Sequence, residues 1–176
     1  THAIINIDDE HAQIMLDTAH ASQLTVWTYS LDPAKSATFV AAEIKPSLQG
    51  VEIALRTDFG NEKINIINVV SPLLGRFNVA NLLAAIGAAV ALDISLERIA
   101  AVIPQLQGAV GRMQRVPSND GCFIVDYAHT PDALNQVLAS LKTHCKGQLW
   151  AVFGCGGDRD AGKRPLMAQA GLAGAD

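Results

Sequence analysis

The spacing of apolar residues changes along the chain, and each change predicts a different kind of element. Residues 3–7 and 24–29 are short apolar runs on either side of a helix-like segment at 10–20, which predicts an α/β unit. Apolar residues then alternate or cluster between turn residues, which predicts an antiparallel meander. The meander strands are expected at residues 38–44, 51–57 and 64–70.

Helical spacing follows the predicted meander. An alanine-rich helix is expected at about 78–92 with Asn78 as its N-cap, and a second at about 95–104 capped by Ser95. The run at 122–125, a helix starting at Thr130 and the run at 149–153 predict a right-handed crossover between parallel strands. Ligands of such sheets bind beyond the carboxyl ends of the strands, so we expect the loops after both runs on one edge.

The chain therefore divides into two unequal parts of α/β class. Residues 1–108 are expected to form a mixed sheet with an antiparallel meander and helices, and residues 109–176 the first part of a Rossmann-like parallel-sheet domain. The last crossover is unfinished at Asp176, so we expect an internal fragment of a longer protein, with both ends cut inside folded domains.

Composition limits the class of protein. The chain has 176 residues, of which 49% are hydrophobic, enough to form a core. Its net charge of −4 argues against a nucleic-acid binder. Its longest apolar run, 82–92, is too short for a membrane helix, and no secretory leader is visible. The three cysteines lack ligand spacing, so we expect free thiols in a reducing cytoplasm and no metal ligands.

Amides and an arginine offer the first candidate chemistry. Asn78 and Asn81 lie one turn apart and present a donor and an acceptor suited to a purine edge, although Asn78 alone is also a good N-cap. Arg112 follows the proposed domain boundary. It is either a solvated surface charge or a phosphate ligand whose guanidinium reaches a molecule held between domains.

Asp126 and His129 follow the predicted strand at 122–125. Asp126 either bonds nearby backbone amides or accepts hydrogen bonds from ribose hydroxyls, as acidic residues after strands do in nucleotide folds. His129, taken singly, is interpreted as an ordinary loop histidine.

Residues 157–164 match the phosphate-loop pattern GxxxxGK[ST] except at the last position. Arg164 has no hydroxyl for magnesium, and Asp158 and Asp160 would repel phosphates, so we reject that interpretation. Arg159 and Lys163 suit a carboxylate, and the aspartates suit an ammonium group; a solvated, charge-balanced loop is the alternative. A dinucleotide-binding GxGxxG loop is also incomplete, which argues against an oxidoreductase.

Five segments occur in the order seen in Mur ligases, and the chain resembles that family, most closely its tripeptide synthetases. The segments are residues 75–81 (GRFNVAN), 111–113 (GRM), 126–131 (DYAHTP), 154–160 (GCGGDRD) and 163–165 (KRP). The resemblance extends over essentially the whole chain, because residues 6–9 are also similar to the family's central domain. DYAHTP is shared with cyanophycin synthetases, whereas its pairing with GCGGDRD and KRP favours the Mur ligases.

The resemblance implies an ATP- and Mg2+-dependent amide ligase that adds meso-diaminopimelate to UDP-N-acetylmuramoyl-L-alanyl-D-glutamate in the bacterial cytoplasm, acting as a monomer without nucleic acid or membrane. It places residues 1–108 in the central ATP-binding domain and 109–176 in the C-terminal ligase domain. By similarity, Arg159 and Lys163 bind the amino acid, and five other residues bind ATP. These five are Asn78, Asn81, Arg112, Asp126 and His129.

The family's phosphate loop and carbamylated lysine have no match in this sequence, so catalytic residues are expected upstream of Thr1 and the chain alone should not turn over. The selector of the amino acid would lie beyond Asp176. A lysine-adding or other Mur-type ligase, and a nucleotide-binding module without catalysis, therefore remain as alternatives.

Overall fold

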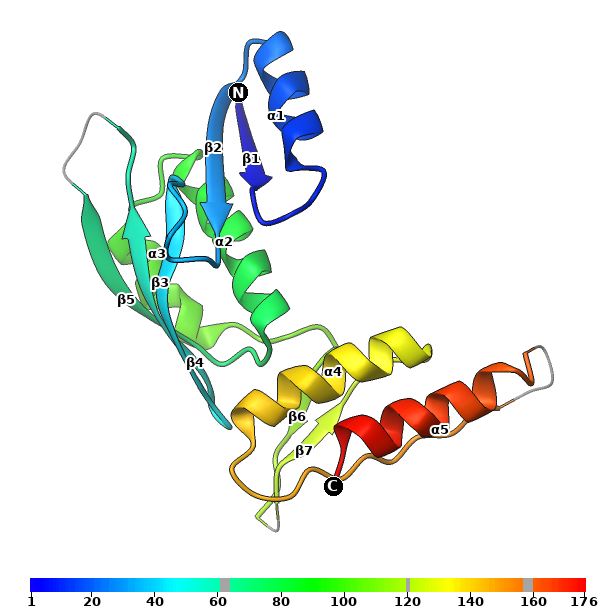
Figure 1. Ribbon diagram of the computed structural model, residues 1–176. Helices are drawn as coiled ribbons and strands as arrows, with labels where there is room; N and C mark the ends of the chain where they lie inside the picture. The colour runs from blue at the N-terminus through cyan, green and yellow to red at the C-terminus, as the bar shows by residue number, and fades with distance from the viewer. Residues whose placement is uncertain (61–63, 120, 157–159) are drawn as a thin grey trace.

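The computed structural model describes residues 1–60, 64–119, 121–156 and 160–176 (Figure 1). Five strands form one mixed sheet in sequential order. They are β1 (His2–Asn6), β2 (Thr25–Ser30), β3 (Phe39–Ser47), β4 (Gly50–Thr57) and β5 (Asn65–Ser71). The first three run parallel and the last three antiparallel, so the predicted meander is confirmed.

Four helical segments pack on this sheet. Helix α1 (Ala12–Ala21) contacts β1 and β2, and α2 (Arg76–Val90) lies against β1, β2 and β3. Helix α3 (Leu96–Val102) and the 3-10 turn η1 (Ile103–Gln105) contact β5. The Ser95 hydroxyl accepts a hydrogen bond from the Arg98 amide, which confirms the predicted cap.

The core of this first unit lies between α2 and the sheet. Phe39 is fully buried and meets Trp27 and Phe59 edge to face, an arrangement that aromatic quadrupoles favour. Gly87 lets α2 approach β1 closely, because an added β-carbon would lie 2.8 Å from Cγ2 of Ile4. The small residue at this position therefore determines how closely α2 packs against the sheet.

The second unit pairs β6 (Gln114–Val116) with β7 (Phe123–Val125) antiparallel and adds α4 (Pro131–His144) and α5 (Lys163–Gly174). The two helices lie side by side (Figure 1). A small apolar cluster lies between them. The cluster consists of Leu134, Leu138, Met167 and Ala170. Thr130 caps α4 by accepting from the Ala133 amide at 3.2 Å, as predicted.

The strand expected at 149–153 does not form, and that prediction is wrong. The Leu149 backbone bonds Asp176 instead, through its amide at 2.8 Å and its carbonyl at 2.9 Å. The run still alternates: Leu149 and Ala151 pack on the α4–α5 cluster, while Trp150 and Val152 are exposed. Within the described ranges β7 pairs only with β6, so the expected parallel pair is absent there.

The Asp8 carboxylate fixes the loop after β1. It accepts hydrogen bonds from the Ser30 hydroxyl at 2.6 Å, the Leu31 amide at 2.7 Å and the Lys35 ammonium group at 2.9 Å. Burial alone would raise the pKa of Asp8, but the three donors outweigh burial and lower the pKa below its ordinary value of 3.8. The ionised carboxylate therefore joins the ends of β1 and β2.

Asp8→Asn is expected to lower the free energy of unfolding at pH 7 by about 1–2 kcal/mol, because a neutral amide cannot accept from three donors. A carboxyl whose pKa falls on folding stabilises the fold above its ordinary pKa and loses that contribution as the pH drops through the lowered value. The Tm difference from wild type should thus shrink as the pH falls below 3.8. Scanning calorimetry from pH 7 to pH 3 measures it, with Asp9→Asn as the exposed control. A pH-independent difference would contradict this role.

Candidate functional site

Asp126, directly after β7, ties its own loop to the segment that contains Met113. Its two carboxylate oxygens accept the Met113 amide at 2.8 Å and the Ala128 amide at 2.7 Å. The bonds to backbone amides expected under the simpler interpretation are therefore present. A carboxylate has about four acceptor positions, so Asp126 can still accept from ligand hydroxyls. Asp126 is half-buried.

Arg112 is presented by a tight turn in the segment between the units. Gly111 and Met113 both have positive φ, at 70° and 45°, and the Gly111 amide donates to the Gln114 side chain at 2.8 Å. This turn places the Arg112 guanidinium 4.7 Å from the centre of the Tyr127 ring, a cation–π contact. Arg112 is therefore held in position although its side chain is exposed.

His129 completes this group on the loop after β7. Its Nδ1 lies 3.0 Å from the Tyr127 carbonyl, and the two rings are 5.0 Å apart in an edge arrangement. Tyr127 thus contacts both Arg112 and His129, yet the sequence analysis did not select it. The sequence shows only an aromatic residue beside an acidic one in a loop, a pattern too common to single out a functional residue.

Asn78 lies inside α2 and is not its N-cap, so that expectation is wrong. The cap position belongs to Gly75, whose φ of 93° ends the preceding extended segment. The Asn78 amide group instead donates to the Leu74 carbonyl at 2.7 Å, which leaves its oxygen and one N–H available. Asn81 is exposed and three residues further on, so both amides lie on one face of the helix.

Met113 connects the α2 start to the Asp126 loop. It is buried, and its terminal methyl would lie 3.4 Å from a β-carbon added at Gly75. Its backbone amide is the one that Asp126 accepts. Met113 therefore links the start of α2 to the Asp126 loop, through its side chain on one side and its backbone amide on the other.

Lys163 begins α5, and its amide donates to the Asp160 carboxylate at 3.1 Å. Arg159 falls within residues 157–159, outside the described residues. Figure 1 shows α4 and α5 side by side with their first residues at the same end. The first residues of both helices therefore lie at one end of the second unit.

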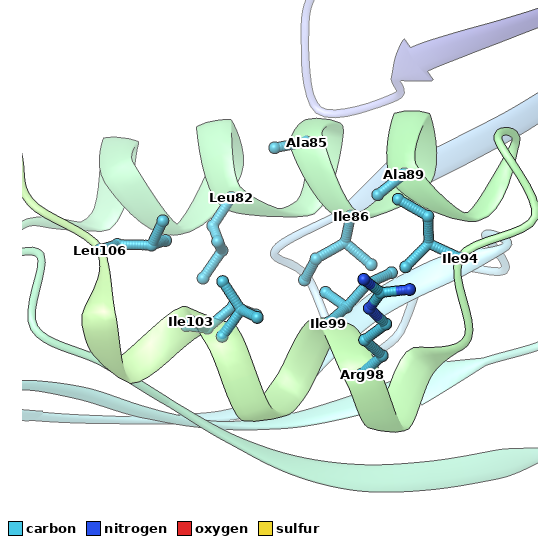
Figure 2. A pocket seen from close by; sticks show the side chains of 10 residues that line it. Leu82, Ala85, Ile86, Ala89, Ile94, Arg98, Ile99, Ile103 and Leu106 are labelled. Carbon is cyan, nitrogen blue, oxygen red and sulfur yellow. The ribbon is translucent and has the colours of Figure 1, made fainter.

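An apolar pocket of about 330 Å3 lies elsewhere, between α2 and α3 (Figure 2). Leu82, Ile86, Ile99 and Ile103 line it, and Arg98 supplies its only charge. This lining cannot satisfy a triphosphate or a zwitterion, which need several donors. The candidate site is therefore the Asp126 loop and the surfaces joined to it, and not this pocket.

Metal ligands are not concentrated in the described part of the chain. There, no three histidine, cysteine, aspartate or glutamate side chains gather closely enough to hold a metal ion. The three cysteines are free thiols. In the same residues, no helix is both long and apolar enough to span a bilayer.

Comparisons with known proteins agree with the two units. Residues 1–89 match the family described as Mur ligase middle domain, and residues 111–176 the one described as Mur ligase, glutamate ligase domain. The curated UDP-N-acetylmuramoyl-L-alanyl-D-glutamate--2,6-diaminopimelate ligase of Pseudomonas aeruginosa is 48% identical over 166 residues, which is 94% of this chain and 32% of that protein. The protein with the same name from a Nostoc species is 41% identical over 170 residues, or 95% and 33%.

Solved structures of Mur ligases also match this chain. A structure titled as a UDP-N-acetylmuramoyl-L-alanyl-D-glutamate--2,6-diaminopimelate ligase matches with a TM-score of 0.80 and 48% identity over 100% of this chain and 35% of that one. A structure titled as a UDP-N-acetylmuramoylalanyl-D-glutamyl-2,6-diaminopimelate--D-alanyl-D-alanyl ligase from Acinetobacter baumannii matches with a TM-score of 0.67 and 26% identity over 82% of this chain and 30% of that one. The chain spans about a third of the length of the curated relatives it matches.

Proposed function

Since this chain belongs to the Mur ligase family, we propose that it forms part of an ATP-dependent ligase adding meso-diaminopimelate to UDP-N-acetylmuramoyl-L-alanyl-D-glutamate in peptidoglycan synthesis. The observation that carries the proposal is the relatives of that name, up to 48% identical over 94% of the chain. The full-length protein, a polypeptide of the relatives' length containing this chain, would be a cytoplasmic, monomeric bacterial enzyme. Its substrates would be small molecules, with neither nucleic acid nor membrane as partner.

We assign residues 1–108 to the central ATP-binding domain and residues 109–176 to the C-terminal ligase domain. Two observations support this division. The family matches end at residue 89 and resume at residue 111. The chain also has two separate apolar clusters, one under α2 and one between α4 and α5.

The chemistry requires an activated carboxyl group. The γ-phosphoryl group of ATP passes to the terminal carboxylate of the dipeptide, which gives an acyl phosphate and ADP. The amine of diaminopimelate then attacks the acyl carbon, phosphate leaves, and the nitrogen loses a proton. Closure of the domains keeps water from the acyl phosphate.

The described residues would bind the nucleotide between the two units. Asp126 would accept the ribose hydroxyls, and Arg112, held over Tyr127, would contact the ribose and phosphates. Asn78 and Asn81 would read the adenine edge, with His129 beside the nucleotide. The amide atoms left open on Asn78 and the open acceptor positions of Asp126 support these roles.

Magnesium would accompany ATP and neutralise phosphate charge, as it does in phosphoryl-transfer enzymes generally. The part of the chain that the structure describes offers no cluster of three ligands for the ion. Ligands of the metal would therefore come from the nucleotide and from other parts of the full-length protein.

Ligation by the purified full-length protein tests the proposal. We expect ADP and phosphate release only when ATP, the UDP-muramoyl dipeptide and meso-diaminopimelate are all present. Lysine, which lacks the second carboxylate, should support turnover at least about a hundredfold less well, because a polar site rejects analogues that leave its groups unpaired. Equal turnover with lysine would instead identify a lysine-adding ligase, and nucleotide binding without ligation would indicate a binding module.

A further inference from the structure

His144 is a buried histidine that bridges the two units. It is the last residue of α4 and is 4% exposed. Its Nε2 lies 3.0 Å from the Gly75 amide nitrogen, and its Nδ1 lies 2.7 Å from the Ser47 carbonyl oxygen. Gly75 is the N-cap of α2, and Ser47 ends β3, so one ring contacts two elements of the other unit.

The partners define the state of the ring. A backbone amide can only donate and a carbonyl can only accept, so Nδ1 carries the hydrogen and Nε2 offers a lone pair. Nε2 is therefore an acceptor only in the neutral ring. The amides at a helix start lack intrahelical partners, and Gly75 has no side chain to cap α2. His144 satisfies the Gly75 amide from another part of the fold.

Ser140, one turn before His144, packs against the same glycine. A β-carbon added at Gly75 would lie 2.9 Å from the Ser140 hydroxyl oxygen. That hydroxyl is buried and, among the described residues, has no hydrogen-bond partner. The contact between α4 and Gly75 is therefore close, and among the described residues its one hydrogen bond runs from the Gly75 amide to Nε2 of His144.

Helix α4 has a candidate nucleotide group at each end. Its first residue follows the 126–130 loop, and its last residue bonds the start of α2, where Asn78 is the third helical residue. Its 14 residues form a rigid rod of about 21 Å. Movement at the Gly75 contact would shift the Asn78 amide relative to the Asp126 loop.

We propose that His144 is a positioning residue, which holds the first turn of α2 through the Gly75 amide and so sets the adenine-binding amides against the ribose-binding loop. The proposal rests on the proposed function, since it takes these groups to bind one nucleotide. His144 itself does not contact the ligand.

Two substitutions separate the two hydrogen bonds of the ring. Glutamine places an oxygen near Nε2 and can still accept from Gly75, whereas asparagine places its amide near Nδ1 and cannot reach Gly75. In the full-length protein, we expect His144→Asn to weaken ATP binding about tenfold and His144→Gln less than about twofold, because a lost acceptor leaves a buried donor unpaired. Ser140→Ala, on the same face of α4, should leave the Kd unchanged.

Isothermal titration with ATP and steady-state ligation measure these effects. We expect the KM for ATP to follow the Kd, while kcat at saturating ATP stays near wild type. A general loss of stability would lower the ATP affinity of both variants together. Equal ATP affinity in His144→Asn and His144→Gln, whether both are normal or both weakened, would overturn the proposal.

Imidazole 15N chemical shifts of His144 supply a readout independent of activity and of variant folding. We expect the neutral tautomer with hydrogen on Nδ1, and the opposite tautomer or a charged ring would overturn the proposal. Asn78→Ala distinguishes a failure of the His144 proposal from a failure of the proposed function. If Asn78→Ala binds ATP normally, the assignment of the nucleotide site fails; if it binds weakly while His144→Asn binds normally, only the role of His144 fails.

Discussion

Replacing Asp126 with alanine is expected to weaken ATP binding to the full-length protein by about thirtyfold to a hundredfold, with the core intact. Loss of a hydrogen bond to a charged group accounts for about 1.5–3 kcal/mol. The structure adds a second effect. The same carboxylate accepts the Met113 amide, so its removal also loosens the turn that holds Arg112 over Tyr127.

Titration with ATP, together with a thermal melt, measures this effect and checks folding. Asp132→Ala is the matched control, because it removes one acidic group from the exposed first turn of α4. An Asp126→Ala protein that melts like wild type and binds ATP with an unchanged Kd would remove Asp126 from the nucleotide site.

The elements predicted correctly are those that depend on local sequence. The meander follows from alternation inside each strand and from turns such as Gly50, which has a φ of 137°. A β-carbon on Gly50 would collide with the Ser71 carbonyl oxygen, so only glycine fits. Ser95 and Thr130 were found as caps because their signal lies within three residues.

The failures depend on partners distant in sequence. The run at 149–153 has the composition of a strand, but a strand needs a neighbour, and Leu149 bonds Asp176, 27 residues away. Strand β6 was not predicted because its three residues carry too little pattern. Asn78 was predicted as the N-cap but is the third residue of α2, because the backbone of Gly75, and not a polar side chain, begins the helix.

Parts of the site were visible in the sequence as polar residues after strand-like runs. Asp126 and His129 were selected in this way, and Arg112 from its place at the proposed domain boundary; the structure brings the three together around Tyr127. The bond from Gly75 to His144 spans 69 residues, and no periodicity or spacing could predict it. The sequence thus indicates which groups carry chemistry, whereas the contacts that position them follow from the tertiary fold.

The second large effect is expected at Arg159, on the loop before α5. Asp160 holds the start of that helix by accepting the Lys163 amide, and Lys163 is half-buried at its first position. An arginine guanidinium offers a planar pair of donors to a carboxylate, which a lysine ammonium group does not reproduce. We propose that this pair orients the amine of diaminopimelate toward the acyl phosphate.

Arg159→Lys in the full-length protein is therefore expected to reduce diaminopimelate-dependent turnover by about a hundredfold, with little change in ATP affinity, because orientation of the nucleophile is lost while charge is kept. Ligation at varied diaminopimelate and saturating ATP measures it. Arg98→Lys makes the same chemical change on α3, away from the loop, and should behave as wild type. If Arg159→Lys kept the wild-type kcat and KM for diaminopimelate, the loop would be a solvated, charge-balanced turn, and amino-acid recognition would depend on other residues.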